Sequence, residues 1–239
     1  MKTTVETLKK IIDTATINGE SEYVLLKFSK DKVMATSMNS SHTVMAYTEA
    51  KPDQFEEYRE IGELIISKSQ ISNLFSVYKN SDKIEISSNG DKLITKSETA
   101  EYKMALTSPE TVPKLQPPSD EGGRLKLKNV EEKNVYETNI NVPLLNTEIT
   151  RIIPNPLTIA QTINDVDEYK KVLVINNRLL STEDDKAVLV STSYLSKVLK
   201  SLMPGATSIL SLSGQDKPVQ IYQQTDQLRT LYVIAPLVE

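Results

Sequence analysis

The strongest constraint on the fold is a pattern that occurs twice along the chain of 239 residues. The pattern of residues 68–106 predicts an amphipathic helix followed by three strands, and residues 192–235 predict the same order again. Helices are indicated by apolar residues three or four positions apart, and strands by alternation of apolar and polar residues. The repeat lies in the order of elements rather than in the residues themselves. It predicts an α+β chain built from two similar units.

The first half of the chain has the clearest pattern. Apolar side chains at helical spacing predict helices over residues 5–15 and 68–79. Asn89-Gly90 between two alternating runs is a strong signal for a β-hairpin. Strands are predicted over residues 23–29, 32–38, 42–48, 59–67, 83–88, 91–97 and 100–106.

Residues 107–123 interrupt this regular pattern. They contain four prolines and the pair Gly122-Gly123, a composition typical of an extended connection. We therefore predict an N-terminal domain over residues 1–106, a connecting loop over 107–123 and a C-terminal domain over 124–239.

The second half is harder to interpret at its start. Asn155-Pro156 resembles a helix start, and the apolar residues that follow predict a helix over 156–166. A helix over 142–153 is the alternative. A further helix is predicted over 192–202, and strands over 135–141, 147–153, 171–176, 178–181, 186–191, 207–213, 218–223 and 229–235. On this interpretation the second half is about one strand shorter than the first.

Composition excludes several classes of site. The chain has no cysteine, which excludes disulfides, thiol nucleophiles and thiolate metal sites, and its single histidine, His42, excludes paired-histidine metal sites. No apolar run reaches the length of a membrane span, and no phosphate-binding or dinucleotide motif is present. The net charge of −4 means that any contact with nucleic acid requires a local basic surface.

Three local motifs resemble the sliding clamps of the proliferating cell nuclear antigen (PCNA) family, including viral, phage and archaeal members. They are Leu8-Lys9-Lys10-Ile11-Ile12, the run Thr36-Ser37-Met38-Asn39-Ser40-Ser41-His42, and Leu231-Tyr232-Val233-Ile234-Ala235-Pro236. Tyr194-Leu195 also lies where the last helix of the family begins. The resemblance is carried by residues 1–106 and by the C-terminal part of the chain.

This resemblance implies two similar clamp domains, with helices lining a ring and antiparallel sheets outside it. It implies a DNA polymerase processivity factor without enzymatic activity or cofactor. Such a ring, usually a homotrimer, encircles double-stranded DNA independently of its sequence. The implied partners are a DNA polymerase, a clamp loader and replication or repair proteins that carry short peptide motifs. The implied location is inside the cell at replicating DNA, in the nucleus of a eukaryotic host or otherwise in the cytoplasm or nucleoid.

Lysines suit a surface along which DNA slides, because they contact phosphates as flexible point charges and do not read bases. Residues 186–215 contain three lysines and no acidic residue, which favours one basic helix face. The predicted DNA-facing residues are Lys2, Lys9 and Lys10 on the first helix, Lys79 at the end of the second, Arg151 near the third, and Lys197 and Lys200 on the last.

The resemblance also implies a hydrophobic pocket for partner peptides. The matching positions are Met38, His42, Thr43, Met45, Val112, Leu115, Pro218, Ile234, Ala235 and Pro236. Thr43 is more polar than the family's usual residue, and Val233 replaces an aromatic side chain. Ordinary core packing is the alternative role for Met38, Met45 and Ile234.

Two other functions are compatible with the sequence. One is a subunit of a heteromeric or checkpoint-type clamp with the same fold. The other is a metal-dependent nuclease that uses the acidic runs Asp165/Asp167/Glu168 and Asp184-Asp185.

Overall fold

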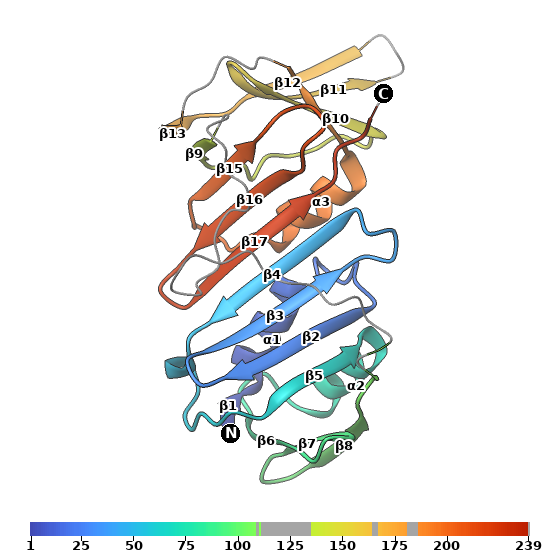
Figure 1. Cartoon of the computed structure of the whole chain (residues 1–239), viewed down its shortest axis with the longest axis vertical. Coiled ribbons are helices and arrows are strands. Elements are labelled where there is room, and N and C mark those ends of the chain that lie inside the picture. Colours follow the sequence, from blue (N-terminus) through green and yellow to red (C-terminus); the bar gives the residue numbers. More distant parts are fainter. Residues whose placement is uncertain (109, 111–134, 164–166, 181–185, 239) are drawn as a thin grey trace. The chain divides into compact units, whose positions relative to one another are not determined.

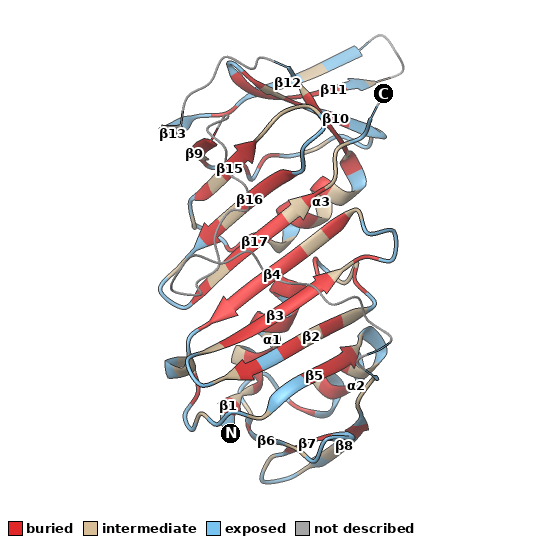
Figure 2. Cartoon of the chain, viewed as in Figure 1, coloured by how far each residue is buried: buried red, intermediate tan, exposed pale blue. Residues whose placement is uncertain are grey.

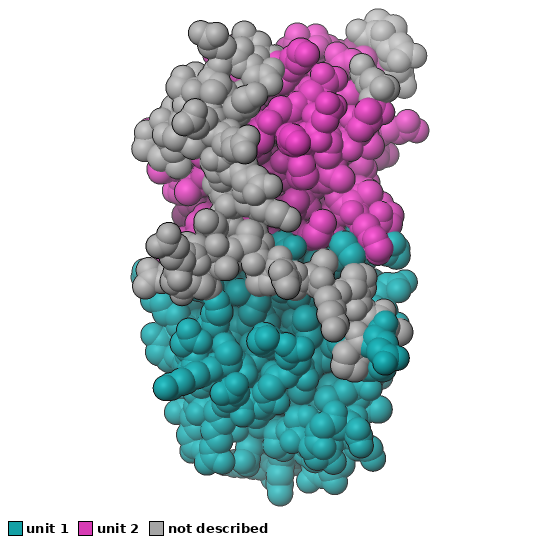
Figure 3. All heavy atoms as spheres, in the orientation of Figure 1, with its two compact units in different colours: residues 1–40, 46–117, 226–230 teal, residues 41–45, 118–225, 231–239 magenta. Residues whose placement is uncertain are grey.

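The computed structural model describes residues 1–108, 110, 135–163, 167–180 and 186–238, without the side chains of 177–180. The chain divides into two compact units (Figure 3). Unit 1 consists of residues 1–40, 46–117 and 226–230, and unit 2 of residues 41–45, 118–225 and 231–239. Each unit therefore includes a short segment from the other half of the chain. The domain limits predicted from the sequence remain a prediction.

The described residues of unit 1 form two α-helices and two antiparallel sheets (Figure 1). In one sheet the strand order is β1-β6-β7-β8, and in the other the strands of this unit follow the order β4-β3-β2-β5. The helices are α1 (Val5–Ala15) and α2 (Lys68–Val77). The strands are β1 (Lys2–Thr4), β2 (Tyr23–Ser29), β3 (Lys32–Met38), β4 (Val44–Ala50), β5 (Gly62–Ser67), β6 (Lys83–Ser88), β7 (Lys92–Lys96) and β8 (Glu101–Ala105), and a 3₁₀ turn covers Pro52–Gln54.

Both helices of unit 1 begin at the residues that their caps predict. The Thr4 hydroxyl accepts a hydrogen bond from the backbone N–H of Thr7. Ser67 and Gln70 form a capping box, in which each side chain bonds the other residue's backbone N–H. The predicted helix over 5–15 is confirmed, and that over 68–79 ends two residues early, at Val77.

Unit 2 has one helix, α3 (Thr192–Ser201), among its described residues, again with two antiparallel sheets (Figure 1). The strand orders within this unit are β12-β11-β10-β14 and β13-β9-β15-β16-β17. Its strands are β9 (Val135–Thr138), β10 (Ile149–Pro154), β11 (Leu157–Ile163), β12 (Asp167–Val172), β13 (Ile175–Leu180), β14 (Val188–Ser191), β15 (Ser208–Leu212), β16 (Val219–Gln224) and β17 (Leu228–Ile234).

The predicted helix over 156–166 is wrong, and so is the alternative over 142–153. Asn155-Pro156 forms the tight turn of a hairpin, because Pro154 of β10 pairs with Leu157 of β11. Residues 157–161 are all buried, so both faces of β11 are covered. A strand covered on both faces has no alternation of apolar and polar residues, and its apolar residues can fit helical spacing by chance. Among its described residues, the second half has nine strands where eight were predicted, because β11 forms in place of the predicted helix.

The two units repeat one topology. The order β1-β6-β7-β8 in unit 1 corresponds to β9-β15-β16-β17 in unit 2, and β4-β3-β2-β5 corresponds to β12-β11-β10-β14. Helix α2 follows β5 as α3 follows β14. The units differ in the connection between their first two strands, which contains α1 in unit 1 and no helix over residues 139–148 in unit 2.

The buried side chains come mostly from the strands and from one face of each helix (Figure 2). Leu8 and Ile12 of α1 and Leu195 and Val198 of α3 are at most 3% exposed. This aliphatic core agrees with the low aromatic content of 5%. Among the described residues, no helix is long and apolar enough to cross a membrane.

Candidate nucleic-acid interface

Helix α1 presents two of the predicted lysines outside its buried face. Val5, Leu8 and Ile12 are buried, whereas Lys10 is exposed and Lys9 is half-buried at the flank of the helix. Because 3.6 residues make one turn, Lys10 points nearly opposite to the buried stripe. The Lys10 ammonium donates to Oε1 of Gln227, also in unit 1, at 2.8 Å.

Lys9 is held in place from two sides. Its ammonium forms an ion pair with Asp13, one turn later in α1. It also lies 5.1 Å from the centre of the Phe75 ring in α2, a cation–π geometry. Phe75 is not among the site residues that the sequence predicts. Its contact with Lys9 joins residues of two different helices, and the spacing of either helix alone does not reveal it. Lys9 thus has part of its charge balanced within the protein.

Lys79 is an exposed residue two positions after the end of α2. Its backbone N–H donates to the Asp82 carboxylate at 2.9 Å, which orders the turn that leads to β6. The lysine therefore sits on a fixed backbone with its side chain in solvent.

In unit 2 the predicted lysines lie on α3, opposite its buried face. Leu195, Val198 and Leu199 are buried, Lys197 is half-buried and Lys200 is exposed. Lys200 occupies the last turn, where a cation is favoured by the helix dipole. Helix α3 has no acidic residue, so its outward face is uniformly neutral or basic.

Two predicted DNA-facing residues are placed differently from expectation. Lys2 lies on strand β1, not on the first helix, and its ammonium pairs with Glu57 at 2.6 Å. The hydrogen bond with Glu57 raises the pKa of Lys2 and lowers the pKa of the Glu57 carboxyl. The charge of Lys2 is therefore compensated locally.

Arg151 lies in the middle of β10 and is exposed. The predicted helix beside it is absent. Thr150, its neighbour, is buried and reaches the hydroxyl of Thr192 at the start of α3 at 2.8 Å. Successive side chains of a strand point to opposite faces, so Arg151 points away from α3. Arg151 is therefore separate from the basic face of α3.

The predicted peptide-pocket residues are divided by their exposure. Met45 and Thr43 are half-buried in β4 and the residues before it, and the Ala235 N–H donates to the Thr43 carbonyl at 2.8 Å, all within unit 2. Ile234 is 1% exposed, which fits the alternative of core packing. Of the remaining positions, Met38 is half-buried at the end of β3 in unit 1, Pro236 is half-buried, His42 and Pro218 are exposed, and Val112 and Leu115 lie outside the described residues.

The loop before β4 is fixed by hydroxyl groups. The Ser41 hydroxyl lies 2.9 Å from the Thr43 hydroxyl and 3.2 Å from the Tyr194 hydroxyl of α3. His42 adopts a positive φ of 58°, which is uncommon for a residue with a side chain and typical of a tight turn. The contact between Ser41 and Tyr194 joins two of the family-like motifs inside unit 2.

The acidic runs considered for a nuclease do not form a metal site in the described part of the chain. Asp167 and Glu168 are exposed on β12, and Glu168 pairs with Lys170 at 2.9 Å. Among the described residues no group of three His, Asp or Glu side chains is placed to hold a metal ion. Asp165, Asp184 and Asp185 lie outside the described residues.

No protein-family model and no curated protein sequence matches the chain. Solved structures do match over its whole length. The PCNA of A. fulgidus, in a structure with the C-terminal region of FEN-1 bound, has a TM-score of 0.73 and 19% identity, and the match covers 100% of this chain and 98% of that one. The PCNA of Entamoeba histolytica has a TM-score of 0.75 and 14% identity, with 99% and 98% covered. The chain therefore has the sliding-clamp fold of PCNA.

Proposed function

We propose that the chain is a subunit of a ring-shaped sliding clamp that encircles duplex DNA and acts, without enzymatic activity, as a processivity factor for a DNA polymerase inside the cell. The observation that carries this proposal is the doubled topology, which matches PCNA structures over nearly the full length of both chains. A ring holds DNA by closure, so weak phosphate contacts suffice and sliding is not impeded.

The sheet edges supply the means of closing a ring from several copies. Within unit 1, the start of β17 lies beside β4, with the hydroxyls of Thr48 and Thr230 3.5 Å apart. By the internal repeat, β8 corresponds to β17 and β12 corresponds to β4. Both β8 and β12 are outer strands of their sheets. An unpaired edge strand readily pairs with another chain. Pairing of β8 from one copy with β12 of the next would therefore repeat the internal arrangement head to tail, and such contacts close into rings.

The basic helix faces supply the DNA contact. Lys9 and Lys10 on α1, Lys79 after α2 and Lys197 and Lys200 on α3 are the residues that we assign to phosphates. The net charge of −4 then keeps DNA from adhering elsewhere on the surface. Proteins with short peptide motifs, including the polymerase, would dock on the surface formed by Thr43, Met45, Ala235 and Pro236 in unit 2.

Topological retention on DNA tests the proposal directly. The protein is mixed with linear duplex DNA, half of which is then ligated into closed circles, and both samples are washed at high salt. A ring is expected to stay on the circles and slide off the linear molecules. In parallel, sedimentation should show a closed oligomer, with a trimer giving three times the subunit mass of 26.7 kDa. Equal loss from circles and linear DNA would contradict the proposal.

A further inference from the structure

The connection over residues 139–148 is too short to repeat the helix of unit 1. Residues 5–22 join β1 to β2 and contain α1 and the turn after it, whereas only residues 139–148 join β9 to β10. Eleven helical residues and a return do not fit into ten. The absence of a helix here is therefore a property of the chain length as well as of the local sequence.

One buried side chain holds this connection in place through hydrogen bonds. Gln161 of β11 is 1% exposed and accepts a hydrogen bond from the Leu145 N–H at 2.7 Å. Its amide nitrogen lies within hydrogen-bond distance of the Leu145 carbonyl at 3.0 Å, the Thr147 hydroxyl at 2.8 Å and the Thr150 hydroxyl at 3.1 Å. A single amide thus fixes the backbone of the segment at its centre.

The end of the segment lies at the start of α3, as the end of the corresponding connection in unit 1 lies at the start of α2, where the Lys68 N–H donates to the Glu22 carbonyl at 2.7 Å. The Thr192 N–H at the start of α3 donates to the Glu148 carbonyl at 3.0 Å, and the Thr147 and Thr192 hydroxyls are 3.2 Å apart. In unit 1, Lys9 of α1 contacts Phe75 of α2. On the sheet, Gln161 of β11 corresponds to Ser37 of β3, whose hydroxyl contacts Ser21 and the Ala15 carbonyl at the end of α1. Residues 139–148 therefore lie on the same face of their sheet as α1 does in unit 1.

The surface chemistry of the two positions is different. Helix α1 carries Lys9 and Lys10, whereas residues 139–148 contain no lysine or arginine and one acid, Glu148. The exposed side chains of the segment are Asn139, Asn141, Pro143, Leu145, Asn146 and Glu148. A surface of this kind has no cation with which to bind a phosphate.

We infer that the DNA-binding surface of the chain is asymmetric: phosphates are bound by α1, α2 and α3, while residues 139–148 form a rigid segment without cations that faces DNA without binding its phosphates. This inference rests on the proposed clamp function. It implies that unit 1 holds DNA at two helices and unit 2 at one. The segment is a spacer, since its backbone is fixed by Gln161 and its side chains offer no counter-charge.

Added and removed charges test this inference. The probe is a short linear duplex DNA at low salt, and the readout is the slope of log K against log salt concentration, which changes by about 0.9 for each phosphate contact. The double variant Asn141→Lys/Asn146→Lys is expected to steepen the slope, by up to about 0.9 per lysine, because new cations then face DNA. The double variant Lys197→Ala/Lys200→Ala is expected to flatten it by a similar amount. Gln224→Lys is the matched control: Gln224 is exposed on β16 and, by strand alternation, points with Tyr222 to the face opposite the buried Ile221.

The outcomes separate the two proposals. If the wild-type protein shows no salt-dependent binding of the duplex and no retention on closed circles, the clamp function itself is wrong. If the wild-type protein binds but Asn141→Lys/Asn146→Lys steepens the salt slope no more than Gln224→Lys does, the segment does not face DNA. An unchanged slope after the loss of Lys197 and Lys200 would likewise overturn the inference. Thermal unfolding of each variant shows whether its fold is intact.

Discussion

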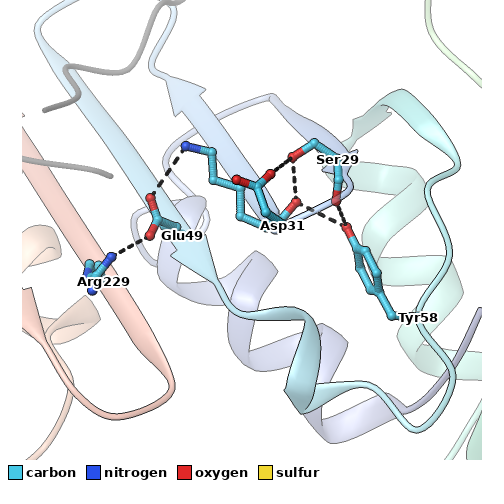
Figure 4. Close-up of polar contacts among 6 residues, drawn as sticks. Ser29, Asp31, Glu49, Tyr58 and Arg229 are labelled. Atoms are coloured by element: carbon cyan, nitrogen blue, oxygen red, sulfur yellow. Dashed lines mark hydrogen bonds and ion pairs between the residues drawn. The ribbon is translucent and has the colours of Figure 1, made fainter. Parts of the chain in front are cut away.

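The guanidinium of Arg229 reaches the carboxylate of Glu49 at 2.8 Å, joining residues that are 180 positions apart in the sequence (Figure 4). Glu49 is only 8% exposed and Arg229 is 19% exposed, and Lys32 approaches the same carboxylate at 3.8 Å. All three residues belong to unit 1. A buried carboxylate between two cations ties the start of β17 to the end of β4 within this unit.

Removal of the arginine should leave Glu49 with one distant cation. We expect Arg229→Met to lower the free energy of unfolding by about 3 kcal/mol, because it leaves a buried charge poorly compensated. The double variant Glu49→Gln/Arg229→Met should lose less than the sum of the single changes. Urea unfolding of the wild-type protein, Glu49→Gln, Arg229→Met and the double variant measures the coupling energy between the two side chains.

The exposed ion pair of Lys27 and Glu63, at 2.8 Å, is the matched control. Both side chains are more than half exposed, so Lys27→Met should change stability by less than about 1 kcal/mol. Equal losses for Arg229→Met and Lys27→Met would show that burial does not strengthen the Glu49 pair.

Alkaline pH should weaken unit 1 through Tyr58. Its hydroxyl lies 2.5 Å from the carbonyl of Ser29 and 3.1 Å from that of Lys32, with the carboxylate of Asp31 close by (Figure 4). Burial, with Glu60 and Asp31 nearby, raises the pKa of Tyr58 to about 12. The phenol of an unfolded chain has a pKa of about 10.

Because the folded pKa is the higher one, the contribution of Tyr58 to stability is complete below about pH 10 and is lost as the pH rises through about 12. The free energy of unfolding should fall across this window more steeply in the wild-type protein than in Tyr58→Phe. Denaturant unfolding at a series of pH values compares the two slopes. Parallel profiles would mean that Tyr58 ionises as easily in the folded as in the unfolded protein.

The amide of Gln161 should be critical for unit 2. Gln161→Leu leaves the Leu145 N–H and C=O without this partner, and we expect a loss of about 3 kcal/mol in the free energy of unfolding. Thr162→Ala, at the exposed neighbouring position of β11, should be nearly neutral. Hydrogen exchange at Leu145 should accelerate in the first variant only. Slow exchange at Leu145 in Gln161→Leu would mean that the Gln161 amide does not hold the backbone of residues 139–148 in place.

Ring closure through β12 can be tested by proline at two adjacent positions. Backbone N–H groups of a strand alternate between its two neighbours, so one of Lys170 and Lys171 points its N–H toward β11 and the other toward the free edge. One of Lys170→Pro and Lys171→Pro should therefore stay folded as a monomer, while the other loses stability. Sedimentation and thermal unfolding distinguish the two effects. A folded, fully assembled oligomer for both variants would remove β12 from the interface.

Peptide docking on unit 2 can be tested at Met45. This side chain is half-buried, so Met45→Glu should keep the fold while placing a charge on the proposed apolar surface. A peptide from the C-terminal region of FEN-1, the region bound in the A. fulgidus PCNA structure, is the probe. We expect at least tenfold weaker binding by fluorescence anisotropy, which corresponds to about 1.4 kcal/mol. Thr207→Glu, at an exposed position of the same unit, is the control. Equal affinities of the two variants would exclude Met45 from the docking surface.

Local sequence determined the elements whose side chains have one buried and one exposed face. The helix over Val5–Ala15 and the strands over Tyr23–Ser29 and Lys32–Met38 have the limits that the sequence predicts, and Thr192–Ser201 ends one residue early. In these elements the period of the apolar residues and the capping hydrogen bonds are set by residues a few positions apart. The lysines of α1 and α3 could be assigned to the outward helix faces for the same reason.

Tertiary structure alone decided the features that depend on distant residues. Leu157–Ile163 is a strand because neighbours cover both of its faces, and this erases the period that distinguishes strands from helices. The pairing of Lys2 with Glu57 changes the role expected for that lysine. The ion pair of Arg229 and Glu49 joins residues 180 positions apart, so it forms only in the folded chain. The doubled order of helix and strands was therefore readable from the sequence, because short-range periodicity encodes it. The strand over Leu157–Ile163 and the buried ion pair were not, because they depend on contacts formed only in the folded chain.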